Sequence, residues 1–217
     1  MTRAGRVLLL GGGHHAAVVA ESARAAGWTV AGCLDDRAGE DLLIAEIGLE
    51  RLGAIDDLRA VLARDVADRP GPTAVHAATG DPARRRAWLA AAESAGAEAA
   101  TIVHPAAVVS PSARLGPGVF IGPGAIINAR ARVARGAIVN SGAIVEHDCR
   151  LEAFCHVAPG AVLAGTVTVG EDALVGVGAA VHPSVRVGRS ARLGAGAVAV
   201  SDIPDGLCAV GVPARPR

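Results

Sequence analysis

One histidine in this chain stands between two carboxylates. His147 follows Glu146 and precedes Asp148, and a carboxylate beside an imidazole can fix its tautomer and raise its basicity. This arrangement favours general-base chemistry, in which the ring takes a proton from a reacting group. The alternative is a solvated polar corner that has no chemical role.

A glycine loop near the N-terminus indicates a second kind of site. Gly11, Gly13 and Ala16 match the spacing GxGxxG/A between an expected strand and an expected helix, and Asp35 follows about 20 residues later. Taken alone, this pattern is a dinucleotide-binding fingerprint. The first half of the chain has room for only about four strands, however, and nothing in it resembles a hydride-transfer site.

The same loop can instead hold the diphosphate of a UDP-sugar, because the backbone N–H groups and the dipole of a helix N-terminus favour anions. On this interpretation His15 faces the sugar, while Asp35 and Asp36 form hydrogen bonds with the nucleoside. The alternative for the two aspartates is a capped turn.

The elements that must position these residues differ between the two halves of the chain. Up to residue 103, short apolar runs alternate with helical stretches, which indicates βαβ units and a small parallel sheet. Strands are expected at 7–10, 29–34, 73–78 and 99–103, and helices at 15–26, 54–65 and 82–95.

A six-residue repeat takes over in the second half. From Val109 to Leu193 an aliphatic residue recurs at every sixth position without an insertion, and four residues after each of them stands a small residue. A period of six fits neither an α-helix nor a solvated strand. It is typical of a solenoid in which three hexads close one triangular coil.

The repeat assigns a place to each residue of the carboxylate–histidine cluster. His147 comes two positions after the inward Val145, so its side chain is expected to point away from the core. Gly165 stands 18 positions after His147 and is expected to stack directly on it in the next coil. Glycines that follow the inward residues, such as Gly170, are expected at the corners because of their permissive backbone angles.

Several strings resemble the left-handed β-helix sugar acetyltransferases that are built from hexapeptide repeats. These strings are LGPGVFIGPGA, VGEDALVGVGA, GGGHHAAVVAE, the pair Asp35-Asp36, NSGAIVEHDCRLEAFCHVAPGAVLAG and the terminal VGVPAR. Together they span essentially the whole chain and are similar to sialic acid O-acetyltransferases and to the UDP-4-amino-sugar N-acetyltransferases of bacillosamine synthesis. The resemblance implies a Rossmann-like α/β domain that binds a nucleotide-sugar (residues 1–103), followed by an all-β left-handed parallel β-helix acyltransferase domain with a C-terminal tail (residues 104–217).

The resemblance also implies roles for residues of the β-helix. His147 matches the general base and Asp148 its partner, although related N-acetyltransferases carry Glu there. Gly165 matches a glycine whose N–H stabilises the oxyanion of the thioester. Val177 and Ala195 match positions that line the CoA groove, where relatives often have Gly at the second.

His156 follows His147 by nine residues, which is half a coil. One subunit would therefore place the two rings on different faces, and a neighbouring subunit could bring His156 close to the base. The matching histidine of the family faces the acceptor or the acyl group. The alternative is a packing role.

These features predict N-acetylation of an amino group on a nucleotide-linked sugar by acetyl-CoA, with direct attack on the thioester. The alternatives are O-acetylation of a sugar hydroxyl and a β-helix protein that is not an acyltransferase. Flat prism faces predict a homotrimer with sites between adjacent β-helices.

Composition narrows the remaining classes of function. Arginines and carboxylates balance at 21 each, so nucleic acid is not an expected partner. Four cysteines without CxxC spacing predict no metal site and fit a reduced, cytoplasmic protein. The N-terminal apolar run is too short for membrane insertion.

Overall fold

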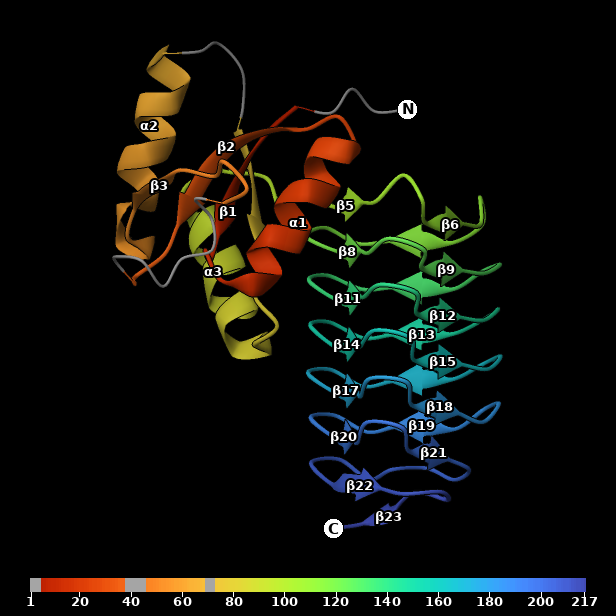
Figure 1. Ribbon diagram of the computed structural model, residues 1–217. Coiled ribbons are helices and arrows are strands. Elements are labelled where there is room, and N and C mark those ends of the chain that lie inside the picture. The colour runs from red at the N-terminus through yellow and green to blue at the C-terminus, as the bar shows by residue number, and fades with distance from the viewer. Residues whose placement is uncertain (1–4, 38–45, 69–72) are drawn as a thin grey trace. The chain divides into compact units, whose positions relative to one another are not determined.

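The computed structural model describes residues 5–37, 46–68 and 73–217. The chain forms two compact units, Met1–Val103 and His104–Arg217 (Figure 1). The first unit is an α/β domain and the second is a coil of short parallel strands. The predicted fold class, an α/β domain followed by a left-handed parallel β-helix, is confirmed.

A four-stranded parallel sheet forms the centre of the first unit. Its strand order is β3-β2-β1-β4, and helices lie between strands in the order of the chain. The elements are β1 (Arg6–Leu10), α1 (His14–Ala25), β2 (Thr29–Leu34), β3 (Arg51–Gly53), the 3-10 helix η1 (Ile55–Asp57), α2 (Leu58–Asp68), β4 (Thr73–Ala77), α3 (Pro82–Ser94) and β5 (Ile102–Val103).

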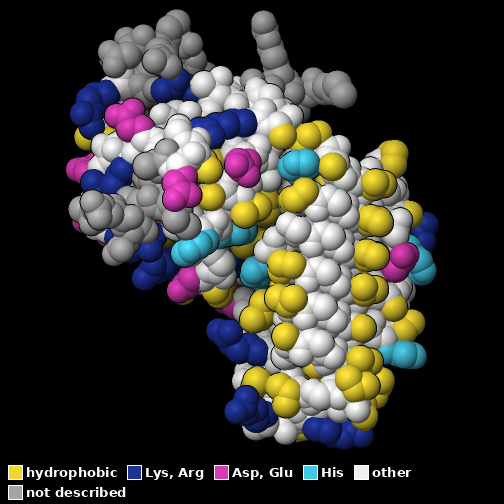
Figure 2. All heavy atoms as spheres, in the orientation of Figure 1, with side chains coloured by type: hydrophobic (Ala, Val, Ile, Leu, Met, Phe, Trp, Pro, Cys, Tyr) yellow, Lys and Arg dark blue, Asp and Glu magenta, His cyan; other side chains and the backbone are white. Residues whose placement is uncertain are grey.

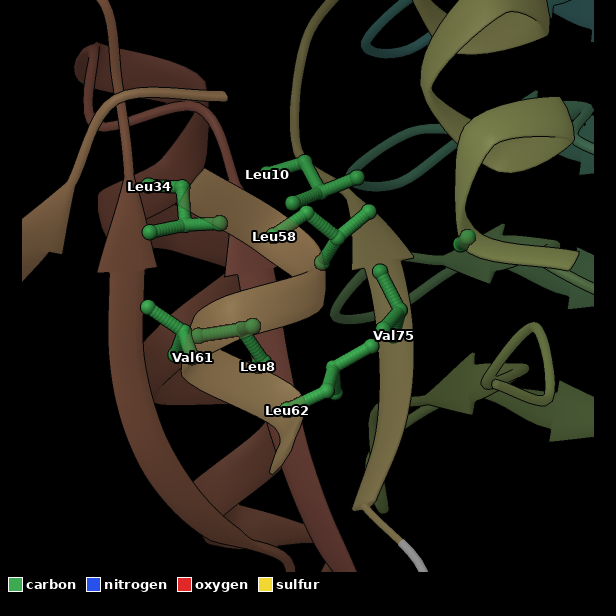
Figure 3. Packing of buried hydrophobic residues seen from close by; sticks show 8 residues of the cluster. Leu8, Leu10, Leu34, Leu58, Val61, Leu62 and Val75 are labelled. Carbon is green, nitrogen blue, oxygen red and sulfur yellow. The ribbon is translucent and has the colours of Figure 1, made fainter. Parts of the chain in front are cut away.

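The core of this unit joins the sheet to α2. Leucine and valine side chains spaced three and four residues apart on α2 form one apolar stripe, and the stripe packs on residues that alternate along the strands (Figure 3). The cluster contains Leu8, Leu10, Leu34, Leu58, Val61, Leu62, Val75 and Ala92.

The fourth strand of the sheet differs from the prediction. It is β3, which pairs with β2 through Cys33 and Leu34. Of the predicted strand at 99–103, Ala99 forms an isolated bridge with Val75, and Ile102–Val103 form β5, which is not part of this sheet. β3 is three residues long and carries no apolar alternation. Sequence periodicity could not reveal a strand that short.

The second unit stacks two-residue strands on three faces, which are named here by their outward side chains. The aliphatic face consists of β6 (Val108–Val109), β9 (Ile126–Ile127), β12 (Ile144–Val145), β15 (Val162–Leu163), β18 (Ala180–Val181) and β21 (Val198–Ala199). The arginine face consists of β7 (Arg114–Leu115), β10 (Arg132–Val133), β13 (Arg150–Leu151), β16 (Thr168–Val169) and β19 (Arg186–Val187). The third face has β8 (Phe120–Ile121), β11 (Ile138–Val139), β14 (His156–Val157), β17 (Leu174–Val175), β20 (Arg192–Leu193) and β22 (Cys208–Val210), with β23 (Arg215–Pro216) antiparallel to β22.

The repeat read from the sequence has the correct register. From Ile121 to Leu193 the second residue of each strand is the predicted inward aliphatic residue and is almost wholly buried, as at Ile121 and Val145. Equivalent strands of successive coils pair in parallel. The apolar interior therefore runs along the axis of the coil and leaves the edges free for polar residues.

The expectation for the glycines that follow the inward residues is wrong. Left-handed backbone angles occur two positions later in the hexad, for example at Gly124 and Gly142. Gly170 and Gly122 are needed for a different reason, because a Cβ atom would lie 2.6 Å from the Arg189 nitrogen and 2.8 Å from the Ser141 nitrogen, respectively. Close approach of the next coil therefore selects these glycines.

Candidate active site

The predicted base, its carboxylate partner and the predicted oxyanion donor lie along one edge, where the aliphatic face turns into the arginine face. We name it the histidine edge; it contains His147 and Asp148 of one coil and Gly165 and Thr166 of the next. The repeat dictates this position because Val145 is buried and the side chain two positions later projects outward. His147 is consequently exposed.

Asp148 connects His147 to an arginine of the preceding coil. Its Oδ2 atom lies 2.9 Å from His147 Nδ1. Arg130, 18 positions earlier, donates from Nε to Oδ1 at 2.7 Å and from Nη2 to Oδ2 at 2.7 Å. A carboxylate held by two parallel N–H groups has a defined orientation as well as a defined charge. Sequence reasoning missed Arg130, although its spacing from Asp148 is one full coil.

The charges of this cluster settle which nitrogen of His147 carries hydrogen. The Arg130 guanidinium, and after it the His147 ring, hold the pKa of the Asp148 carboxyl well below its usual range. Asp148 is therefore ionised at neutral pH and only accepts hydrogen bonds. His147 Nδ1 must be the donor, so Nε2 of the neutral ring keeps its lone pair and can accept a proton.

Gly165 lies against the other side of the His147 ring. A Cβ atom at position 165 would be 2.7 Å from Cε1 and 2.7 Å from Nε2 of His147. No side chain fits there while the imidazole keeps its position. The stacking of Gly165 on His147, predicted from their spacing, is present in the structure.

The N–H group of Gly165 is not used by the coil. Among the described residues it donates no hydrogen bond, whereas the Gly165 carbonyl accepts one from the Ser184 N–H at 3.0 Å. The same place in other hexads tolerates proline, which has no N–H to donate. These prolines are Pro111, Pro117, Pro123, Pro159 and Pro183.

Val177 and Ala195 stack on each other at a different edge. This edge, where the third face turns into the aliphatic face, has glycine at each left-handed position and is named the glycine edge; its glycines are Gly124, Gly142, Gly160, Gly178 and Gly196. Val177 and Ala195 are exposed. Their N–H groups, like that of Gly165, donate no hydrogen bond within the described part of the chain. One chain therefore does not bring them next to His147.

His156 lies on the third face, at the start of β14. Its Nε2 atom is 3.2 Å from Asn140 Nδ2. The side-chain oxygen of Asn140, Oδ1, accepts a hydrogen bond from the Ser141 N–H at 2.8 Å. Because this bond orients the amide, Asn140 Nδ2 donates and His156 Nε2 accepts. The structure does not bring His147 and His156 together within one chain.

The glycine loop of the first unit joins β1 to α1. Gly11 has a φ of 107°, and a Cβ atom there would meet the Ala78 carbonyl oxygen at 3.0 Å and the Trp88 ring at 3.2 Å. Gly13 is the N-cap of α1, which has no side-chain cap and no acidic residue in its first turn. The loop and helix have the form that the fingerprint predicts.

Asp35 has an arginine partner that sequence reasoning missed. Its Oδ2 accepts from the Gly12 N–H at 2.7 Å, and Arg37 donates to both carboxylate oxygens at 3.0 and 3.1 Å. Burial raises the pKa of Asp35, but the hydrogen bonds from Arg37 and Gly12 outweigh it and the net shift is downward. Arg37 Nη2 would also lie 3.1 Å from a Cβ atom at Gly13, so its charge borders the loop.

The two remaining residues of the predicted nucleotide site have separate positions. Asp36 Oδ1 accepts a hydrogen bond from the Ile55 N–H at 3.0 Å, at the start of η1. The capped-turn alternative corresponds instead to Asp35, whose Oδ1 accepts from the Arg37 N–H at 2.9 Å. His15 is half-buried in the first turn of α1. The loop therefore brings together Gly11, Gly13, His15 and Asp35, while Asp36 is bonded to the segment before α2.

Within residues 5–37, 46–68 and 73–217, no three His, Cys, Asp or Glu side chains gather as ligands for a metal ion. In the same ranges, none of the helices has the length and apolar character that crossing a membrane requires.

Comparisons with known proteins gave matches over both units. Residues 6–91 match the PglD N-terminal domain family. PerB from Caulobacter crescentus, solved in complex with CoA and GDP-perosamine, is 42% identical, covers 98% of this chain and 97% of its own, and superposes with a TM-score of 0.88. The acetyltransferase domain of PglB from Neisseria gonorrhoeae FA1090 is 36% identical over 98% of this chain and 99% of its own, with a TM-score of 0.88.

A more distant structure shares the fold alone. WeeI from Acinetobacter baumannii AYE is 21% identical over 98% of this chain and 100% of its own, with a TM-score of 0.83. The PglB domain has also been solved in complex with acetyl coenzyme A. A comparison with curated protein sequences gave no match.

The contact between Gly165 and His147 generates a first prediction. Gly165→Ala is expected to displace the exposed imidazole and lower kcat by about tenfold or more, because a small misplacement of a reacting group is costly. The melting temperature is expected to change little, since the clash is with the free end of a side chain. Steady-state kinetics and thermal melting of the purified protein measure both.

The His147→Ala background provides the control. If the methyl group acts through the ring, Gly165→Ala costs much less there than in the wild type. Equal losses in both backgrounds would contradict the proposed contact.

Proposed function

We propose that this chain, which belongs to the hexapeptide-repeat sugar acetyltransferases, transfers the acetyl group of acetyl-CoA to the amino group of a nucleotide-linked amino sugar. Family membership rests on relatives that are 36% and 42% identical over nearly their whole length, and it confirms the resemblance read from the sequence. PerB holds CoA and GDP-perosamine in its crystal structure, so both classes of substrate have a precedent on this fold.

One observation carries the mechanism. His147 has Nδ1 bound to an ionised Asp148, and its Nε2 edge lies against Gly165. A free basic nitrogen beside an unused N–H group is what acyl transfer to an amine requires. The base removes a proton from the attacking nitrogen, and the N–H donates to the oxygen that becomes negative.

The reaction follows from these positions. The amine nitrogen attacks the thioester carbonyl, and a C–N bond forms while the carbonyl oxygen gains negative charge beside the Gly165 N–H. His147 Nε2 accepts the amine proton. The C–S bond then breaks, the carbonyl re-forms, and the proton passes to the departing sulfur to give the free thiol of CoA.

Direct attack also agrees with the state of the neighbouring cysteine. Cys149 is wholly buried, and its Sγ donates to the Ala164 carbonyl at 3.1 Å. Burial raises the pKa of the Cys149 thiol to about 11. A protonated, inaccessible thiol does not serve as a nucleophile, so no acyl-cysteine intermediate is needed.

A panel of acceptors tests the function itself. The purified protein is incubated with acetyl-CoA and UDP-, dTDP-, GDP- or CMP-linked amino sugars, thiol release is followed, and the product is identified by mass spectrometry. An acetylated product that survives mild alkaline hydroxylamine is an amide. A product that hydroxylamine cleaves is an ester, which would replace N-acetylation by O-acetylation of a hydroxyl.

The second prediction concerns the base. His147→Ala is expected to lower kcat by roughly 10²–10⁴-fold with the fold retained, the usual effect of removing a positioned general base. Asp148→Asn is expected to cost less, because the ring remains. His182→Ala is the matched control, since His182 is an exposed histidine of the same edge with no carboxylate partner among the described residues. Near-normal turnover of His147→Ala with saturating acceptor would exclude the mechanism.

The aliphatic face supports a homotrimer. A column of aliphatic side chains runs along it and is visible in Figure 2 as yellow spheres beside the β6–β21 strands. A continuous apolar column is typical of an interface. The face also separates the edge that carries His147 and Gly165 from the edge that carries Val177 and Ala195, the predicted CoA-groove residues. A second copy would therefore bring the two sets together. The column consists of Val108, Ile126, Ile144, Val162, Ala180 and Val198.

The third prediction tests this interface. Val162→Arg, which places a charge in the column, is expected to reduce the trimer to smaller species and to abolish activity, because each site loses one wall. Val162→Ala keeps the face apolar and is expected to stay trimeric and active. Sedimentation velocity at micromolar concentration measures the assembly, and a wild-type monomer would contradict the proposal.

The first unit is proposed to bind the nucleotide of the acceptor. Two features support this role. The N-terminus of α1 is uncapped and faces no acidic side chain of its first turn, and the Arg37 guanidinium, held by Asp35, borders Gly13. Both favour a diphosphate. His156 is proposed to face the acceptor sugar or the acyl group from a neighbouring subunit.

The fourth prediction separates the two ligands. Asp35→Ala and His15→Ala are expected to raise the acceptor KM several-fold and to leave the affinity for acetyl-CoA nearly unchanged, because the loop is disturbed and the β-helix is not. Calorimetry with each ligand alone measures the difference. Tight binding of NAD with no binding of any nucleotide-sugar would show that the loop is a dinucleotide site instead.

A further inference from the structure

The histidine edge differs from the glycine edge in the type of residue at its left-handed corners. At each left-handed corner the glycine edge has glycine, as at Gly142 and Gly160, whereas the histidine edge has Arg130, Asp148 and Thr166 with φ of 60°, 61° and 62°. Residues with a Cβ atom adopt this conformation at an energetic cost. The side chains of the histidine edge must therefore contribute something that glycine cannot.

Their contacts show what that contribution is. Arg130 binds both oxygens of Asp148, and its own N–H donates to Ser112 Oγ at 3.0 Å. On the other side of His147, Thr166 Oγ1 lies 2.7 Å from Ser184 Oγ. Each corner residue is thus bonded to the corner of an adjacent coil. Asp148 is the member of this column that contacts the base.

Stability does not explain the ion pair between Arg130 and Asp148. The Arg130 side chain is 66% exposed and that of Asp148 is 34% exposed. An ion pair in contact with water contributes little to folding, because solvent screens the charges and two flexible side chains are ordered. A bidentate contact does, however, fix the plane of the carboxylate. This contact therefore serves to orient the Asp148 carboxylate rather than to stabilise the fold.

We propose that Arg130 is a positioning residue for the acetyl-transfer reaction, acting through Asp148 on His147. The guanidinium of the preceding coil holds Asp148 with Oδ2 toward His147 Nδ1, so that Nε2 stays directed at the reacting amine. This inference rests on the proposed function of His147 as the base.

Replacing Arg130 by glycine separates an effect on the position of the base from an effect on folding. Arg130→Gly removes the contact and also removes the cost of a left-handed corner, so the melting temperature is expected to stay the same or to rise. The value of kcat is expected to fall about tenfold to a hundredfold, because the base loses its fixed direction. The acceptor KM is expected to change little. Sedimentation of the variant checks that the assembly is intact.

A lysine at the same position distinguishes charge from direction. Arg130→Lys keeps the charge but cannot make the bidentate contact. Its kcat is therefore expected to remain reduced. Added guanidinium at low millimolar concentration is expected to restore part of the kcat of Arg130→Gly.

Arg132→Gln is the matched control. Arg132 is an exposed arginine of the same coil and has no ion pair among the residues that the structure describes. It is expected to leave kcat unchanged. The inference is overturned if Arg130→Gly keeps wild-type kcat, or if Arg132→Gln lowers kcat to the same extent. Failure of the underlying function is seen separately, because His147→Ala would then remain active.

Discussion

In-register stacking of coils is the constraint on which the β-helix depends. The N–H groups of one rung bond to carbonyls of a neighbouring rung, as from Ile126 to Ala143 and from Asp148 to Ala129. A shift of a single residue would turn the inward aliphatic residues outward. Each residue consequently has a fixed neighbour one coil away, and chemistry at an edge is built in columns. The vertical contacts of Arg130, Asp148 and Gly165 are all of this kind.

The same hydrogen-bond scheme leaves one N–H group of each hexad outside the backbone ladder. Where no ligand uses it, proline can occupy the position, as at Pro159. Gly165 occupies the equivalent place on the histidine edge, and Val177 and Ala195 occupy it on the glycine edge. Each edge of the β-helix therefore has backbone N–H donors that the hydrogen bonds between coils do not use. Which of them become functional depends on the side chains stacked above and below.

Much of this architecture could be predicted, because a strict period of six determines which residues are inward and which stack. The places of His147 and Gly165 followed from that period. Arg130 did not, since the chain has arginine as its only strong base, at 21 positions, and arginines on outward positions are common. Only the spacing of one coil from Asp148 could have singled it out. Glycines such as Gly170 were assigned to permissive angles because sequence does not show how closely the next coil approaches.

Asp35 and Asp148, the carboxylates proposed to be functional, share one structural solution. Each receives a bidentate contact from an arginine, Arg37 and Arg130 respectively. A lysine would neutralise such a carboxylate from any direction, whereas a planar guanidinium fork defines its plane. In both places the carboxylate also bonds a third group, the Gly12 N–H of the loop in one unit and the His147 ring in the other. On the proposed mechanism, each aspartate works through the group that it orients, and the arginine determines that orientation.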